Sequence, residues 1–277
     1  MKTVTLPGGV AVPALGQGTW NMGERPAVRA EELATLRMGL DLGLNLIDTA
    51  EMYGEGQAEE LVGEALAGRR DEAFIVSKVY PHNASRRGTA AACERSLRRL
   101  RTDRIDLYLL HWRGTVPLAE TMQAMHDLRQ AGKIRHYGVS NLDLADMREL
   151  WAIETGRAVA VNQLLYNLTR RGIEWDLLHW LRQHHIPLMA YSPIEQARLL
   201  DDTRLKGFGR RYGIAPAQAA LAWLLARPDI IAIPKASQRE RVRENHAALA
   251  ITLSAEQMAE LDQLFAPPTG PTALQML

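Results

Sequence analysis

The sequence predicts a (β/α)8 barrel with an N-terminal β-hairpin, and three observations support this fold class. Short apolar runs of the kind found in strands alternate with segments of helical periodicity from residue 14 onward. Eight such pairs follow one another, at a spacing of roughly 30 residues, and right-handed βαβ units repeated in this way close into a barrel. The length of 277 residues suits one barrel of about 250 residues, so we expect residues 1–277 to form a single domain.

The first half of the chain contains five strand–helix pairs. The first helix shows the pattern clearly, because Leu33, Leu36 and Leu40 form an apolar stripe and Gly43 stands where a helix commonly ends. The strands are expected at residues 15–20, 44–48, 73–78, 105–111 and 134–141, and their helices at 31–43, 57–66, 89–100, 118–132 and 144–151.

Three further pairs complete the predicted barrel. The strands are expected at residues 158–163, 186–192 and 230–235, and the helices at 173–184, 217–227 and 238–249, with a loop before the second of these helices. The strands are apolar on both faces, as a barrel wall covered by helices requires. An open doubly wound sheet is the alternative. It is disfavoured because neither "GQG" (16–18) nor "GFGRRYG" (207–213) forms a credible dinucleotide-binding turn after a strand.

Composition excludes several classes of protein. The formal net charge of +1 gives no reason to expect nucleic acid or an acidic membrane surface as a partner. The single cysteine, Cys93, excludes an internal disulfide framework and a Cys-rich zinc site. No run of about 18 apolar residues occurs, so no transmembrane span is expected. The N-terminal segment is interrupted by Pro7, Gly8, Gly9 and Pro13. A hairpin is therefore expected there and not a signal peptide. We expect a cytoplasmic monomer.

Polar residues stand at the carboxyl ends of the predicted strands. Asp48, Lys78 and His111 end the second, third and fourth strands, and Tyr53 lies in the loop after Asp48. Taken singly, each has an ordinary structural interpretation, such as a solvated lysine, a core histidine or a turn-capping carboxylate. In a barrel these strand ends form one rim, where barrel enzymes place their chemistry. Buried charges are costly for stability, so the convergence of the four residues favours a catalytic site.

This quartet is suited to reducing a carbonyl group or oxidising an alcohol. An ammonium stabilises phenolate, so Lys78 is expected to lower the pKa of Tyr53 and make it a better general acid. Asp48 would keep Lys78 charged and oriented, and His111 could donate a hydrogen bond to the same substrate oxygen. None of the four supplies a hydride, so an external donor is required. No metal-ligand set accompanies His111.

Several motifs together resemble the aldo-keto reductase family. They are "LGQGTW", "IDTAEMYGEG", "VSKV", "DLYLLHW", "GKIRHYGVSN", "VNQLLYN", "MAYSP" and "IAIPKASQRERVRENHAAL", in order over nearly the whole chain. Within the family the sequence is most similar to small bacterial members that reduce methylglyoxal and other aldehydes. The resemblance implies a catalytic tetrad of Asp48, Tyr53, Lys78 and His111, in agreement with the quartet found from the strand ends.

The resemblance also implies NADPH as cofactor, bound across the barrel mouth. Its motifs place the nicotinamide amide at Ser140, Asn141 and Gln163, the nicotinamide ring on Tyr191, and the 2′-phosphate at Lys235 and Arg241. The full set of implied cofactor-binding residues is Gly18, Thr19, Trp20, Asp48, Ser140, Asn141, Gln163, Tyr191, Ser192, Lys235, Ala236, Ser237, Arg241, Glu244 and Asn245.

Two points in the last motif leave alternatives open. Many family members have Lys-Ser where this chain has Lys235-Ala236-Ser237, so a hydroxyl contact to the phosphate is lost or comes from Ser237. The arginines of this helix could also form only a solvated basic face. We therefore expect NADPH as the main cofactor, with NADH as the less favoured one.

The predicted substrate is a small carbonyl compound, such as methylglyoxal or an aromatic aldehyde. Trp20, Met52, Tyr80 and Trp112 are candidates for the pocket walls. The loops after the fourth and seventh strands and the tail 267–277 are expected to close the mouth. Two other functions compete with a reductase. One is an NADP(H)-binding sensor or accessory subunit with little turnover, and the other is a barrel hydrolase or isomerase without nicotinamide.

Overall fold

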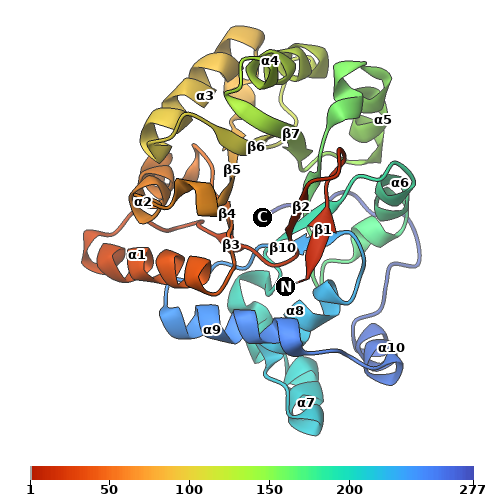
Figure 1. Ribbon diagram of the computed structural model, residues 1–277. Coiled ribbons are helices and arrows are strands. Elements are labelled where there is room, and N and C mark those ends of the chain that lie inside the picture. The colour runs from red at the N-terminus through yellow and green to blue at the C-terminus, as the bar shows by residue number, and fades with distance from the viewer. Residues whose placement is uncertain (1) are drawn as a thin grey trace.

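The computed structural model describes residues 2–277, and its centre is a sheet of eight parallel strands surrounded by helices (Figure 1). Neighbours in the sheet follow chain order from β3 to β10, and parallel bridges from Leu15 to Ala232 and from Gly18 to Lys235 join its two ends. The predicted barrel is therefore confirmed. Its strands are β3 (Gln17–Gly18), β4 (Leu46–Asp48), β5 (Phe74–Val79), β6 (Ile105–Leu110), β7 (Ile134–Ser140), β8 (Asn162–Leu165), β9 (Leu188–Tyr191) and β10 (Ile230–Ala232).

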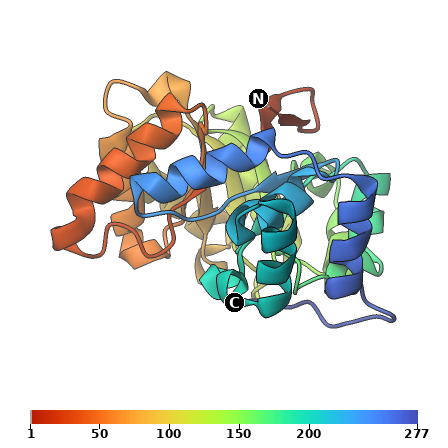
Figure 2. The same ribbon diagram turned by 90° about the horizontal axis from the view of Figure 1, so that it is seen from below.

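A β-hairpin precedes the barrel, as predicted. Strands β1 (Thr3–Thr5) and β2 (Ala11–Pro13) pair antiparallel with Val4 opposite Val12, and both valines are buried. The connecting turn needs residues that tolerate positive φ, and Gly8 and Gly9 adopt φ of 92° and 88°. The hairpin and the C-terminus lie at opposite ends of the barrel (Figure 2).

The described chain also forms ten α-helices and several connecting 3₁₀ turns. They are α1 (Pro26–Asp41), α2 (Gln57–Ala65), α3 (Arg86–Leu100), α4 (Leu118–Gln130), α5 (Leu144–Ala152), α6 (Leu177–Gln183), α7 (Thr203–Tyr212), α8 (Pro216–Leu225), α9 (Arg239–Ala247) and α10 (Ala255–Leu264). The sequence did not predict α7 or α10. Their end signals were nevertheless present: Asp202 caps α7, Gly213 ends it with φ of 67°, and Ser254 and Gln257 form a capping box on α10.

The sixth barrel strand lies further along the chain than predicted. We expected residues 158–163, whereas a 3₁₀ turn occupies Thr155–Ala158 and β8 covers Asn162–Leu165. The backbone of Ala160 and Val161 already bonds to β7, but the regular ladder with β9 begins only where Asn162 pairs with Leu188. Gln163 is thus the second residue of its strand and not the last.

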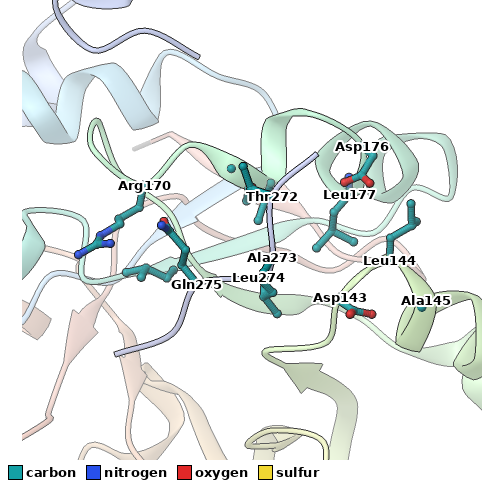
Figure 3. Close-up of a pocket in the computed structure, with 13 residues that line it drawn as sticks. Asp143, Leu144, Ala145, Arg170, Asp176, Leu177, Thr272, Ala273, Leu274 and Gln275 are labelled. Atoms are coloured by element: carbon teal, nitrogen blue, oxygen red, sulfur yellow. The ribbon is translucent and has the colours of Figure 1, made fainter. Parts of the chain in front are cut away.

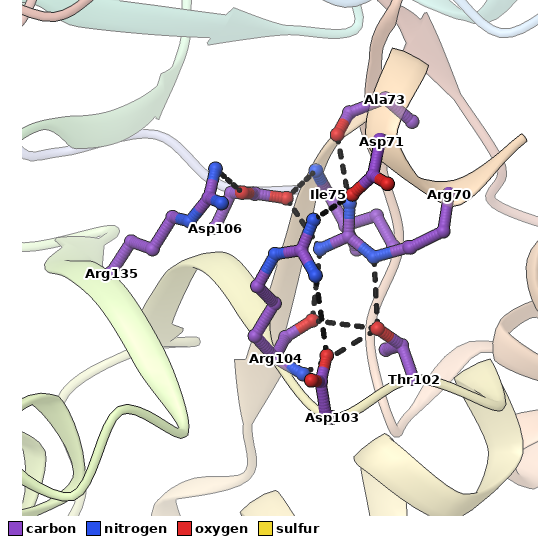
Figure 4. Close-up of polar contacts among 9 residues, drawn as sticks. All are labelled: Arg70, Asp71, Ala73, Ile75, Thr102, Asp103, Arg104, Asp106 and Arg135. Carbon is purple, nitrogen blue, oxygen red and sulfur yellow. Dashed lines mark hydrogen bonds and ion pairs between the residues drawn. The ribbon is translucent and has the colours of Figure 1, made fainter.

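A buried carboxylate organises the amino-terminal edge of the strands (Figure 4). Asp106 of β6 is fully buried and accepts hydrogen bonds from Arg70 at 2.7 Å, from the Ile75 backbone N–H at 2.9 Å and from Arg135 at 3.0 Å. These donors come from the turn before β5, from β5 itself and from β7. In barrels this end of the strands usually serves stability, so we assign Asp106 a structural role.

Replacing Asp106 by Ala should lower the free energy of unfolding by about 3–5 kcal/mol, because it removes a buried carboxylate on which the part-buried Arg70 and the Ile75 backbone N–H depend. The measurement is guanidinium-induced unfolding. Asp103→Ala is the matched control: Asp103 also pairs with an arginine, but its side chain is 85% exposed, and we expect a loss of about 0–1 kcal/mol. Equal losses in the two variants would contradict the structural role of Asp106.

Candidate active site

A cavity of about 760 Å³ opens at the carboxyl ends of the barrel strands. Most of the site residues predicted from the sequence line it, although they come from segments up to more than 200 positions apart in the chain. They are Gly18, Thr19, Trp20, Asp48, Met52, Tyr53, His111, Trp112, Ser140, Asn141, Gln163, Tyr191, Ser192 and Lys235.

The remaining predicted residues lie outside the lining of this cavity. Lys78 is fully buried beneath it, and Tyr80 stands behind Trp112, edge-on with ring centroids 5.9 Å apart. The others are Ala236, Ser237, Arg241, Glu244 and Asn245, and of these Arg241 and Glu244 line a separate surface pocket together with Lys206 and Arg210 of α7.

Lys78 is the centre of the buried polar cluster. Its ammonium donates to Asp48 at 2.8 Å, to the Thr49 carbonyl at 2.8 Å and to the Tyr53 hydroxyl at 3.0 Å. All three of its donor positions are therefore used. The second oxygen of Asp48 accepts from the Gln163 amide at 2.7 Å. The predicted contacts among Asp48, Lys78 and Tyr53 are thus present in the structure.

The environment of these groups sets their protonation. Burial lowers the pKa of Lys78, but the charge of Asp48 and the contact with Tyr53 outweigh this, so its pKa lies above the ordinary value and the ammonium stays charged. For Tyr53, burial raises the pKa and Lys78 lowers it, and burial prevails. Lys78 does lower the pKa of Tyr53, as expected. The expectation that this pKa would lie below its ordinary value is wrong. The phenol keeps its proton at neutral pH, which is the state a proton donor requires.

His111 faces the same space as a neutral imidazole. Burial lowers the pKa of His111 to about 2, with a further contribution from the charge of Lys78. Its ring lies edge-on to Tyr53 with centroids 5.8 Å apart and is tilted against Trp112 at 4.9 Å. Its Nδ1 is buried and has no hydrogen-bond partner within residues 2–277. A neutral imidazole can orient a carbonyl oxygen by a hydrogen bond without competing with Tyr53 as acid.

A second group of polar residues in the cavity lining adjoins this cluster. Ser140 donates to the Gln163 carbonyl at 2.9 Å, and Asn141 donates to the His111 carbonyl at 3.1 Å. The Tyr191 hydroxyl donates to the side-chain oxygen of Asn141 at 3.0 Å. Together they present hydroxyl and carboxamide groups beside an aromatic ring, a combination that suits a planar ligand carrying an amide.

Strained backbone is concentrated around this rim. Among non-glycine residues that line the cavity, positive φ values occur at Asn21 (59°), Asn141 (56°), Ser192 (48°), Gln196 (52°) and Ala197 (71°). Left-handed conformations cost energy for residues with a Cβ atom and tend to collect at functional sites. Their clustering here supports a binding function for the cavity independently of its charged groups.

The lining also includes the loop after the seventh barrel strand, which was expected to help close the mouth, and two residues that were not predicted, Asn21 and Ile233. The loop after β9 contributes Pro193, Ile194, Gln196 and Ala197, and β10 is extended by Ile233. The C-terminal tail contributes Met276 and Leu277, which agrees with the expectation that the tail closes the mouth.

A second, smaller cavity lies beside the C-terminal tail (Figure 3). This space of about 140 Å³ lies between Thr272–Gln275 and the amino-terminal ends of α5 and α6, with Arg170 at its other side. The charged groups around it already have partners: Asp143 and Asp176 cap the two helices, and Arg170 pairs with Glu195 at 2.7 Å. We assign it no ligand.

Within residues 2–277 no group of three or more His, Cys, Asp or Glu side chains is arranged to hold a metal ion. No helix in the described part of the chain is both long and apolar enough to cross a membrane.

Comparison with known proteins links this geometry to one enzyme family. The sequence model of the Aldo/keto reductase family matches residues 14–266. The methylglyoxal reductase YeaE of Escherichia coli (strain K12) is 50% identical over 281 residues, covering 100% of this chain and 99% of the relative. The glyoxal reductase of Bacillus subtilis (strain 168) is 32% identical over 262 residues, covering 95% and 92%.

A solved structure agrees with the sequence relatives. An aldo/keto reductase from Klebsiella pneumoniae, crystallised in complex with NADP and acetate, superimposes with a TM-score of 0.97 at 51% sequence identity. The match covers 100% of this chain and 99% of that one.

Proposed function

The chain belongs to the aldo/keto reductase family and is therefore an oxidoreductase, and we propose that it reduces small aldehydes and ketones to alcohols with NADPH. The observation that carries this proposal is the buried contact of Lys78 with both Asp48 and Tyr53, next to a neutral His111. A protonated phenol held at the edge of a large cavity has the chemistry of a general acid for a carbonyl oxygen.

In the proposed mechanism each residue has a separate task. Tyr53 donates its proton to the carbonyl oxygen as that oxygen gains negative charge. Lys78 stabilises the phenolate that remains, and Asp48 fixes the position and charge of Lys78. His111 orients the carbonyl through a hydrogen bond. The buried surroundings strengthen these interactions because water does not screen them.

NADPH would supply the hydride when bound, and the cavity offers groups that fit it. Ser140, Asn141 and Gln163 offer polar partners for the carboxamide, and Tyr191 offers an aromatic face for the ring. Gly18 lines the same cavity, and a Cβ atom there would approach the Ile233 carbonyl to 3.0 Å. Lys235 lines the same cavity and is bridged to Gly18.

A set of cations supports the choice of NADPH over NADH. Arg241, which pairs with Glu244 at 2.7 Å, shares a surface pocket with Lys206 and Arg210, so three positive side chains and one carboxylate line one space outside the main cavity. A 2′-phosphate is the part of NADPH that NADH lacks, and arginine and lysine are its usual partners. The contribution of α7 was missed in the sequence because this helix was expected to be a loop.

Arg241→Ala should raise the KM for NADPH by about tenfold to a hundredfold and leave the KM for NADH nearly unchanged, because one or two charge-assisted hydrogen bonds are lost. Steady-state kinetics with both cofactors measures this. Arg243→Ala is the matched control, since Arg243 is on the same helix and similarly exposed, at 61% against 59%. It does not line the pocket of Arg241. Equal effects on NADPH and NADH would overturn this assignment.

The substrate class follows from the walls of the cavity and from the named relatives. Trp20, Met52 and Trp112 give it apolar sides, and the half-exposed Met276 and Leu277 leave its mouth adaptable. These features suit a range of small carbonyls more than one bulky substrate. The decisive experiment is a panel of methylglyoxal, glyoxal and aromatic aldehydes assayed with NADPH and NADH in parallel. Tight NADPH binding without turnover on any of them would favour the alternative, a nucleotide-sensing subunit.

A further inference from the structure

Tyr53 begins a short, irregular 3₁₀ segment, Tyr53–Gly56, and its own backbone N–H donates to the Ala50 carbonyl at 3.1 Å. Directly after Tyr53, the residues Gly54, Glu55 and Gly56 adopt positive φ values of 56°, 53° and 94°. Within residues 2–277, the Tyr53 hydroxyl has one hydrogen bond, from Lys78 at 3.0 Å. Side-chain contacts from outside the loop therefore have a large share in fixing where the phenol stands above the ammonium.

Glu51, two residues before Tyr53, is tied to neighbouring elements by its whole carboxylate. It is 6% exposed. One oxygen accepts from the Tyr80 backbone N–H at 2.8 Å and from the Asn83 amide at 3.0 Å. The other oxygen pairs with Arg95 of α3 at 3.2 Å. These bonds join the start of the Tyr53 loop to the loop after β5 and to α3.

A second carboxylate holds the other end of the loop. Glu59 is fully buried and accepts from Ser77 at 2.5 Å and from Arg99 of α3 at 2.6 Å. The Arg99 side chain also covers Gly56, where a Cβ atom would collide with its guanidinium. Ser77 directly precedes Lys78 in β5, so this anchor is joined to the strand that carries the ammonium.

The two anchors share one helix face. Arg95 and Arg99 are four residues apart on α3 and so lie next to each other on its surface. They reach the carboxylates on either side of Tyr53. The proposed proton transfer uses neither pair, and burying two carboxylates is a costly way to stabilise a fold compared with apolar packing.

We propose that Glu51, held by Arg95, is a positioning residue that sets the Tyr53 phenol over Lys78, with the Glu59–Arg99 pair as the second anchor. The inference rests on the proposed reductase function. Glu51 does not line the cavity and acts only through the loop. A displacement of the phenol by about 1 Å would be enough to slow turnover by as much as a hundredfold.

The main test is Glu51→Gln, assayed with NADPH and methylglyoxal. We expect kcat to fall by about tenfold to a hundredfold, with the dissociation constant for NADPH unchanged. Asp106→Asn is the matched control. It makes the same carboxylate-to-amide change at a buried site that also holds arginines, but at the opposite end of the strands. It should destabilise the protein and leave kcat within about twofold of wild type. An equal fall in kcat in both variants would overturn the proposal.

A double variant separates positioning from general destabilisation. If Glu51 acts through the Tyr53 hydroxyl, Glu51→Gln should slow the wild type but add no further loss to the residual rate of Tyr53→Phe. The same factor in both backgrounds would refute the proposal.

Arg95→Gln offers a second route to the same question, because its side chain is 39% exposed and its loss should be tolerated by the fold. Like Glu51→Gln, this variant should lower kcat, and Arg95→Lys should restore part of the lost kcat. If wild type itself turns over no carbonyl, the proposed function fails. If wild type is active and both Glu51→Gln and Arg95→Gln keep full kcat, only the positioning role fails.

Discussion

Tyr53→Phe should lower kcat for carbonyl reduction by about a thousandfold, within the usual range for loss of a general acid. The variant removes one oxygen atom and keeps the ring that packs edge-on against His111. Lys78 retains its bonds to Asp48 and the Thr49 carbonyl. The fall should therefore appear in kcat, as measured by the loss of NADPH absorbance under saturating substrate.

Cofactor affinity provides the internal control for this variant. Trp20 and Trp112 line the cavity, so NADPH binding can be followed by quenching of tryptophan fluorescence. The dissociation constant should match that of wild type. A variant that binds NADPH normally and keeps full kcat would remove Tyr53 as the proton donor.

Lys78→Met should produce the second large effect, on activity and stability together. The ammonium is fully buried and bonded to three oxygens. Removing it leaves the Asp48 carboxylate buried without its charge partner, which should cost about 3–5 kcal/mol in the free energy of unfolding. It also removes the positive charge that stabilises the Tyr53 phenolate, so kcat should fall by about a hundredfold to a thousandfold.

The double variant Asp48→Asn/Lys78→Met distinguishes these two effects. Removing both charges leaves no unpaired carboxylate, so stability should recover by at least about 1 kcal/mol relative to Lys78→Met alone. Activity should not recover, because the phenolate remains without its cation. Guanidinium unfolding and the NADPH assay measure the two outcomes. Recovery of activity together with stability would mean that Lys78 serves only to hold the fold.

The arrangement of the proposed catalytic residues could be predicted because it follows from strand order. Asp48, Lys78 and His111 each stand at or next to the end of a parallel strand, and parallel strands of a barrel direct their ends to one rim. Tyr53 follows from its place in the loop after Asp48. The β-hairpin and the eight strand–helix pairs were predicted for the same reason, since hydrophobic periodicity is local in the sequence.

Other features depend on burial and distant packing, which no local pattern contains. The predicted lowering of the Tyr53 pKa was wrong, because burial raises this pKa by more than the charge of Lys78 lowers it. Helix α7 was missed, and with it the positions of Lys206 and Arg210 beside Arg241. The bonds from α3 to Glu51 and Glu59 were likewise not visible, because they join residues 40 and 44 positions apart.

The most direct test of the proposed function follows the hydride itself. The protein is mixed with methylglyoxal and NADPH that carries deuterium at both positions of the hydride-donating carbon, and the alcohol product is analysed by mass spectrometry and NMR. Direct transfer predicts a single deuterium on the former carbonyl carbon, formed at the rate of NADPH oxidation and nearly absent with Tyr53→Phe. Normal NADPH binding without any deuterated alcohol from any carbonyl of the panel would contradict the proposal and support a sensing role.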